Sequence, residues 1–154
     1  MSRAFFPLAC ATGLGAGYIP VAPGTFGSAV GVILWSLLPS TLAGQGAAIV
    51  VLFGAGVWSS GVAERHFHRT DPSQVVIDEV VGMLMTLFLN PVGWAGAIVG
   101  FVLFRLADIL KPFPANRVER WPGGLGVMAD DAMAAIYANL ALRAVLAAGH
   151  RFIS

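Results

Sequence analysis

Adjacent acidic residues occur twice in apolar sequence, as Asp78 and Glu79 in the stretch VVIDEVVGMLMTLFL and as Asp130 and Asp131 in GVMADDAMA. An acid at the start of a helix can cap free N–H groups, and it interacts favourably with the positive end of the helix dipole. Capping accounts for only one acid of each pair, because neighbouring helix positions point about 100° apart. The second acid of each pair is therefore a candidate for chemistry.

Asp108 is a fifth candidate, in the segment FRLADILKPFP. It lies near the C-terminal end of an expected helix, where the dipole disfavours an anion, so it needs a cation nearby. Arg105 and Lys111 are spaced three residues before and after it, within one broad helix face. One interpretation is a local salt bridge. In the other, acids from three helix ends converge on a hard divalent cation while Arg105 and Lys111 face a phosphate, and an oxygen-only ligand set suits Mg²⁺ rather than zinc.

The segment APGTFGS could supply the other half of a phosphate site. The hydroxyls of Thr25 and Ser28 lie at the start of an apolar stretch, and free N–H groups at a helix N-terminus bind anions. Pro-Gly-Thr is also an ordinary way to turn the chain and begin a helix, so both interpretations stay open for this segment.

The elements that must position these residues are apolar stretches bounded by proline, glycine and charged residues, with no sustained strand alternation. They predict an all-α fold in a single domain over 1–154, a compact helical membrane bundle of about five helices with a polar site facing the cytoplasm. The expected helices cover 24–38, 42–63, 78–89, 94–110 and 130–148.

The composition supports a membrane protein, since 57% of the 154 residues are hydrophobic and 11% are charged, with a mean hydropathy of +0.79. The net charge of +1 excludes a nucleic-acid footprint.

All eight acids lie in two windows, 64–79 and 105–131, and alternating helices place both windows on one side. That side also carries seven of the nine Lys and Arg residues, so the positive-inside rule makes it cytoplasmic. A soluble helical bundle that buries its apolar faces in an oligomer is the alternative.

Four segments in the same order resemble the phosphatidylglycerophosphatase A (PgpA) family of bacterial lipid phosphatases. They are GLGAGYIPVAPGTFGS, DPSQVVIDEVVG, FRLADILKPFP and GGLGVMADDAMA. The resemblance implies Mg²⁺-dependent hydrolysis of phosphatidylglycerophosphate to phosphatidylglycerol and phosphate at the cytoplasmic membrane, in an all-helical fold. It places Asp78, Glu79, Asp108, Asp130 and Asp131 in the catalytic and metal-binding site, and Thr25, Ser28, Arg105 and Lys111 near the substrate phosphate. The chain departs from the family at Ala107, where an aromatic residue is usual, and at Ala135, where glycine is usual.

Other phosphatase chemistries do not fit the spacing of the residues. A cysteine phosphatase needs Arg six positions after its nucleophile, but Ala16 follows Cys10 at that distance, and no Asp-x-Asp pair is present for an aspartyl-phosphate mechanism. Metal-assisted attack by water remains, with one acid as general base.

A small membrane transporter or channel with an acidic ion site is the alternative function. It predicts charges spread through the depth of the membrane, whereas here they gather at one set of helix ends. A structural membrane subunit whose acids only cap helices is a third possibility.

Overall fold

The computed structural model describes residues 4–113, 115–118 and 121–153, which form helices and contain no strand. The all-α prediction is therefore confirmed. The helices are α1 (Phe5–Ala11), η1 (Ala16–Tyr18, a 3₁₀ turn), α2 (Pro23–Leu37), α3 (Leu42–Phe67), α4 (Ile77–Leu87), α5 (Trp94–Leu110), α6 (Ala115–Val118) and α7 (Gly124–Ile153).

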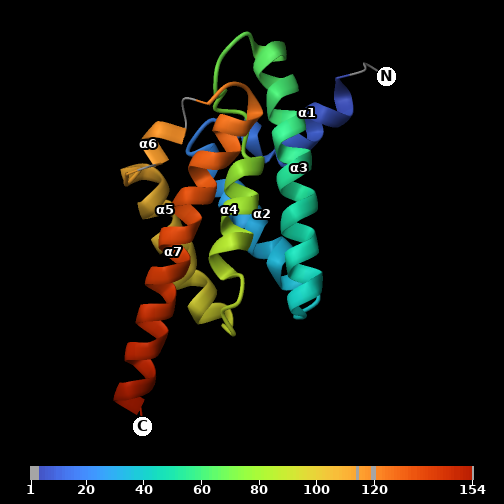
Figure 1. Cartoon of the computed structure of the whole chain (residues 1–154). Helices are drawn as coiled ribbons and strands as arrows, with labels where there is room; N and C mark the ends of the chain where they lie inside the picture. Colours follow the sequence, from blue (N-terminus) through green and yellow to red (C-terminus); the bar gives the residue numbers. More distant parts are fainter. Residues whose placement is uncertain (1–3, 114, 119–120, 154) are drawn as a thin grey trace.

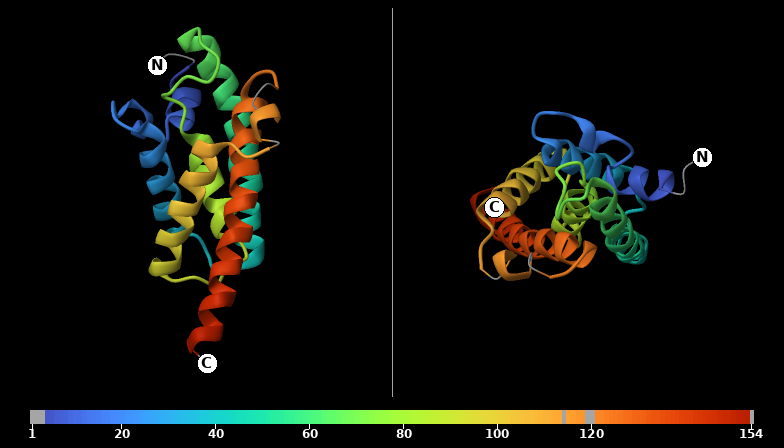
Figure 2. Two further views of the ribbon diagram at one scale, coloured as in Figure 1. Left: turned by 90° about the vertical axis from the view of Figure 1, so that its left-hand side faces the viewer. Right: turned by 90° about the horizontal axis from the view of Figure 1, so that it is seen from above.

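The short helix α4 lies in the middle of the bundle and packs against α2, α3, α5 and α7 (Figures 1 and 2). Nine of its 11 residues are buried. Its sequence explains this position, because after Glu79 it carries no charged side chain and is apolar around its circumference.

Two apolar clusters hold the bundle together. The first joins α4 to α3 and to the start of α7, and Val80, Val81 and Met128 are among its buried members. The second joins α4, α5 and α7 around Phe104 and Leu142. Ala135, where glycine is usual in the family that the chain resembles, is fully buried in this second cluster.

The main difference from the sequence-based prediction is the start of the last helix. The prediction began it at Asp130, but α7 begins at Gly124. Gly124, in the glycine-rich segment before Asp130, lies directly against the backbone of α3 at Val57, where a side chain would clash. Close helix packing therefore explains this glycine, and α1, η1 and α6 are further elements that the sequence did not predict.

Two helices, α3 and α7, are long and apolar enough to cross a membrane by length and composition. Only 22% of the most apolar window of each is buried inside the protein, so most of each window lies on the outside of the bundle. Large apolar side chains such as Val50, Trp58 and Leu140 are exposed on their surfaces. An exposed apolar surface of this kind marks contact with a membrane or a partner.

The helix ends sort into two groups, as the sequence-based threading predicts. The start of α4, the end of α5 and the start of α7 lie at one end of the bundle. The turns at 38–41 and 88–93 lie at the opposite end with the C-terminus (Figure 1).

Candidate active site

The first turn of α4 supplies two carboxylates that do not cap the helix. Val76 occupies the N-cap position, and no side chain accepts a capping hydrogen bond there. The backbone N–H of Val76 instead donates to the carbonyl of Ala11 at 2.8 Å, which fixes the segment leading into α4. Asp78 is 8% exposed and turns into the bundle, so the capping interpretation does not account for this acidic pair.

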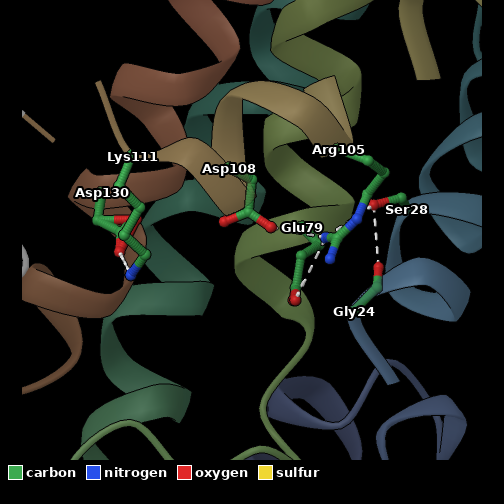
Figure 3. Close-up of polar contacts among 7 residues, drawn as sticks. All are labelled: Gly24, Ser28, Glu79, Arg105, Asp108, Lys111 and Asp130. Carbon is green, nitrogen blue, oxygen red and sulfur yellow. Dashed lines mark hydrogen bonds and ion pairs between the residues drawn. The ribbon is translucent and has the colours of Figure 1, made fainter. Parts of the chain in front are cut away.

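The last turn of α5 brings Arg105 and Asp108 together. Nη1 of Arg105 lies 2.9 Å from Oδ2 of Asp108 and 3.7 Å from Oε1 of Glu79 on α4. The salt bridge expected from the three-residue spacing thus forms, but it does so beside the carboxylates of other helices rather than in isolation. Figure 3 shows Arg105 between Asp108, Glu79 and the start of α2.

The start of α2 supports the guanidinium group of Arg105. The Ser28 hydroxyl is fully buried, donates to the Gly24 carbonyl at 2.9 Å and accepts from Nη1 of Arg105 at 3.5 Å. A side chain at Gly24 would collide with the carboxylate of Glu79 and with Nη1 of Arg105, so only glycine lets α2 approach this closely.

Asp130 and Asp131 lie in the second turn of α7, which corrects the expectation that they open the helix. Neither can therefore be its N-cap, and both are buried. Lys111 follows the end of α5 in a left-handed conformation, with φ of 44°, and its ammonium group donates to Oδ2 of Asp130. Figure 3 shows this pair on the opposite side of Asp108 from Arg105.

The carboxylates form two groups of three that share Asp131. Within each group one oxygen per residue lies within 4.8 Å of the others. One group is Asp78, Glu79 and Asp131, and the other is Asp108, Asp130 and Asp131.

These groups border a cavity of about 230 Å³. Its lining includes all five predicted acids and Lys111, whereas Arg105 and Ser28 lie behind it and Thr25 is not part of it. Two lining residues were missed by the sequence analysis, Asp71 and Ser73. Their position in the segment DPSQVVIDEVVG, ahead of Asp78 and Glu79, could have identified them.

The electrostatics of the cavity favour a bound cation. Burial, and then the charges of Glu79 and Asp131, raise the pKa of Asp78 well above its usual value. Within the described part of the chain, Oδ1 of Asp78, Oε2 of Glu79 and Oδ2 of Asp131 are buried and accept no hydrogen bond. Buried carboxylate oxygens of this kind are costly unless a cation compensates them. An all-oxygen set suits a hard divalent cation such as Mg²⁺, so the residues fit the metal.

The fold and the site together define an all-helical, membrane-associated protein with an acidic centre and two nearby cationic side chains, a combination suited to phosphate chemistry. A family model described as phosphatidylglycerophosphatase A matches residues 9–146. The chain belongs to the phosphatidylglycerophosphatase A family, and it is accordingly an enzyme, a phosphoric monoester hydrolase.

Individual relatives cover most of the chain. Phosphatidylglycerophosphatase A of Haemophilus influenzae is 38% identical over 141 residues, which cover 88% of this chain and 85% of that protein. Phosphatidylglycerophosphatase A of Escherichia coli K12 is 35% identical over 130 residues, which cover 82% of this chain and 75% of that protein. A Bacteroides thetaiotaomicron protein, named provisionally as a phosphatidylinositol-3-phosphatase, is 42% identical over 142 residues, covering 86% and 89% of the two chains. No solved structure matches this chain.

Proposed function

We propose that this protein is a Mg²⁺-dependent lipid phosphatase that hydrolyses phosphatidylglycerophosphate to phosphatidylglycerol and inorganic phosphate. The observation that carries the proposal is the buried carboxylate cluster, which has Arg105 on one side of it and Lys111 on the other. The family supplies the substrate class. The cluster supplies the means of binding a cation and a phosphate together.

The chain's own residues perform the remaining work. A divalent cation held by the carboxylates, when bound, polarises the phosphoryl oxygens and neutralises part of their charge. One carboxylate accepts a proton from the attacking water, whose oxygen bonds to phosphorus as the bond between phosphorus and the glycerol oxygen breaks. The protonated carboxyl group then returns this proton to the leaving glycerol oxygen. Arg105 and Lys111 stabilise the negative charge that spreads over the phosphoryl oxygens.

The surroundings of the cavity suit a lipid headgroup. Large apolar side chains next in sequence to the lining residues are exposed, among them Val21 before α2 and Ile109 and Leu110 beside Asp108 and Lys111. A polar cavity with an apolar rim can take the phosphate of a lipid while the acyl chains stay in hydrocarbon. A freely soluble phosphate ester would not need this rim.

The proposal places the enzyme in the bacterial cytoplasmic membrane as a multi-pass protein, with its site facing the cytoplasm. Support comes from the two apolar helices that are long enough to cross a bilayer and from the distribution of Lys and Arg in the sequence. At 11 residues α4 is too short to cross, so it would lie inside the bundle within the membrane.

The test is phosphate release by the purified protein in detergent. Phosphatidylglycerophosphate should be hydrolysed, exhaustive chelation with EDTA should abolish turnover, and added Mg²⁺ should restore it. Full turnover after chelation would end the metal-dependent mechanism. No release from any lipid phosphate, with or without Mg²⁺, would instead favour an acidic ion site in a transporter or channel.

A second substrate needs a parallel measurement, because the Bacteroides thetaiotaomicron relative carries a name with a different lipid. Phosphatidylinositol 3-phosphate should therefore be assayed at the same concentration. We expect kcat/KM to be higher for phosphatidylglycerophosphate by about tenfold or more. A higher kcat/KM for phosphatidylinositol 3-phosphate would make the inositol lipid the proposed substrate and leave the proposed chemistry of the site unchanged.

A further inference from the structure

The cavity contains more carboxylates than one magnesium ion takes from a protein. Mg²⁺ prefers six ligands at about 2.0–2.1 Å, keeps several waters and is usually held by one or two carboxylates together with substrate phosphate oxygens. The two groups of three contain five acids in all. A single ion therefore does not explain why so many carboxylates gather in one cavity.

The arrangement divides the acids between two centres. Asp131 belongs to both groups, Asp78 and Glu79 come from α4, and Asp108 and Asp130 lie on the side of α5 and α7. Oxygens bound to one Mg²⁺ lie about 3.0 Å apart when adjacent and about 4.2 Å apart when opposite. The oxygens of each group lie within 4.8 Å of one another, so the carboxylates must draw together around a bound ion.

Burial supports a ligand role for the shared acid. Asp131 is 4% exposed and Asp78 8%, both line the cavity, and Oδ2 of Asp131 and Oδ1 of Asp78 accept no hydrogen bond from the described residues. A carboxylate with an unsatisfied buried oxygen beside two sets of neighbouring acids is well placed to bridge two ions.

Charge also favours two ions. Six carboxylates line the cavity, counting Asp71, and together with Arg105 and Lys111 they leave four negative charges when all are ionised. One divalent cation leaves two negative charges that repel a phosphate. A second makes the centre neutral, so a phosphate is no longer repelled. Phosphatases are among the enzymes that use paired metal ions, typically about 3.5–4 Å apart.

We propose that the cavity binds two divalent cations bridged by Asp131, the first with Asp78 and Glu79 and the second with Asp108 and Asp130. The inference rests on the metal-dependent phosphatase proposed above and specifies how many ions its site holds.

The two centres differ in how strongly Arg and Lys side chains compete with a metal ion for the carboxylates. In the second centre Asp108 pairs with Arg105 at 2.9 Å and Asp130 pairs with Lys111, whereas in the first centre Glu79 lies farther from Arg105, at 3.7 Å. A second ion must compete with both cationic side chains, so it binds more weakly than the first. Once displaced, Arg105 and Lys111 are available to a phosphate. Phosphate and the second ion therefore strengthen each other's binding, and by linkage each does so by the same factor.

The test is a Mn²⁺ titration of the full chain in detergent, with free Mn²⁺ counted by electron paramagnetic resonance. Two Mn²⁺ per chain are expected, in a tight and a weaker class, with spin coupling between the ions at saturation. Inorganic phosphate should tighten the weaker class by about fivefold or more. One uncoupled Mn²⁺ per chain at saturation, with and without phosphate, would overturn the proposal.

Variants separate the two centres. Asp108→Asn should remove the weaker class and the effect of phosphate while keeping the tight class, and Asp131→Asn should abolish the spin coupling. Glu64→Gln is the matched control and should bind two Mn²⁺, because an amide oxygen can still accept the N–H of Asp71, 3.2 Å from Oε1 of Glu64. Two classes that survive unchanged in Asp108→Asn would contradict the assignment of the second centre.

The binding readout keeps this inference separate from the proposed function. A protein that hydrolyses lipid phosphate in a Mg²⁺-dependent way but binds one Mn²⁺ per chain refutes the paired centre and leaves the function standing. A protein that binds two coupled Mn²⁺ but hydrolyses no lipid phosphate supports the paired centre and refutes the function.

Discussion

At the scale of single residues, Asp108 makes two kinds of contact in one position. It pairs with Arg105 on its own helix, and it belongs to a carboxylate group completed by α7. The salt bridge and the ligand interpretations of the sequence are therefore not exclusive. They differ in the consequence of removing the charge, because an exposed or half-buried ion pair contributes little to stability while a ligand or base is needed for turnover.

Asp108→Asn keeps the shape of the side chain and removes its charge. We expect turnover to fall by about two orders of magnitude or more, because a metal ligand or general base is lost. The free energy of unfolding should fall by about 1 kcal/mol or less. Both quantities should be measured on the same purified sample, with Glu64→Gln as control. Near-normal turnover in Asp108→Asn would leave the salt bridge as its only role.

Gly24→Ala tests the close approach of α2 to the site. The added methyl group would collide with the Glu79 carboxylate and Nη1 of Arg105, so both must shift. We expect kcat to fall by about tenfold or more while the protein stays folded. Gly54→Ala on α3 is the control, because no atom lies within 4 Å of its new methyl group. That change should leave kcat intact and raise stability by up to about 1 kcal/mol. Equal turnover in the two variants would contradict the packing argument.

At the scale of elements, α4 is the helix on which the site depends, and its two ends are held differently. Its start is fixed by the backbone bond from Val76 to Ala11. Its end is fixed from α7, where Nδ2 of Asn139 donates to the carbonyls of Met85, Thr86 and Phe88 at 3.1, 2.9 and 2.8 Å. A half-buried amide thus satisfies carbonyl groups that the end of a helix leaves without partners.

Asn139→Ala should destabilise the protein by about 1 kcal/mol, because the carbonyls of Met85, Thr86 and Phe88 lose a donor while Nδ2 of Asn90 still donates to those of Thr86 and Phe88. Turnover per folded molecule should change little, since Asn139 lies far along α7 from Asp131. Chemical unfolding in detergent measures the first quantity and a phosphatase assay the second. Arg143→Ala is the comparison, because it removes only the exposed bond from Arg143 to Asn139. A loss of stability in Asn139→Ala no larger than in Arg143→Ala would show that α4 does not need this donor.

At the scale of the whole molecule, polar and apolar surfaces are separated along the bundle. The cavity and its charged residues lie at one end, and α3 and α7 present apolar side chains along their length. A bilayer around these helices would place the cavity at one membrane surface. This is the arrangement from which the cytoplasmic orientation is proposed.

The orientation is tested by labelling single cysteines in intact cells. In a Cys10→Ser background, Arg117→Cys lies beyond α5 on the cavity side and Ser40→Cys lies in the turn between α2 and α3 at the opposite end. A membrane-impermeant reagent should label the Ser40→Cys variant from outside. The Arg117→Cys variant should react only after the membrane is permeabilised. The reverse pattern would refute the cytoplasmic orientation.

The local pattern of the sequence was sufficient to predict the helical fold, the approximate extent of α2 to α5 and the acidic composition of the site. Apolar runs and breaker residues act over a few neighbouring positions, and α5 begins and ends as predicted, at Trp94 and Leu110. Spacing within α5 likewise predicted the pair of Arg105 and Asp108.

Only the tertiary structure decided which helices meet and at what distance. The early start of α7 depends on Gly124 packing against α3, so a glycine-rich segment that resembles a loop becomes helix. The sharing of Asp131 between two carboxylate groups depends on the start of α4, the end of α5 and the start of α7 meeting at one point. Ser28 accepts a hydrogen bond from Arg105, 77 residues away in the sequence. These facts arise from contacts between residues far apart in sequence, and no local spacing encodes the distance between two helices.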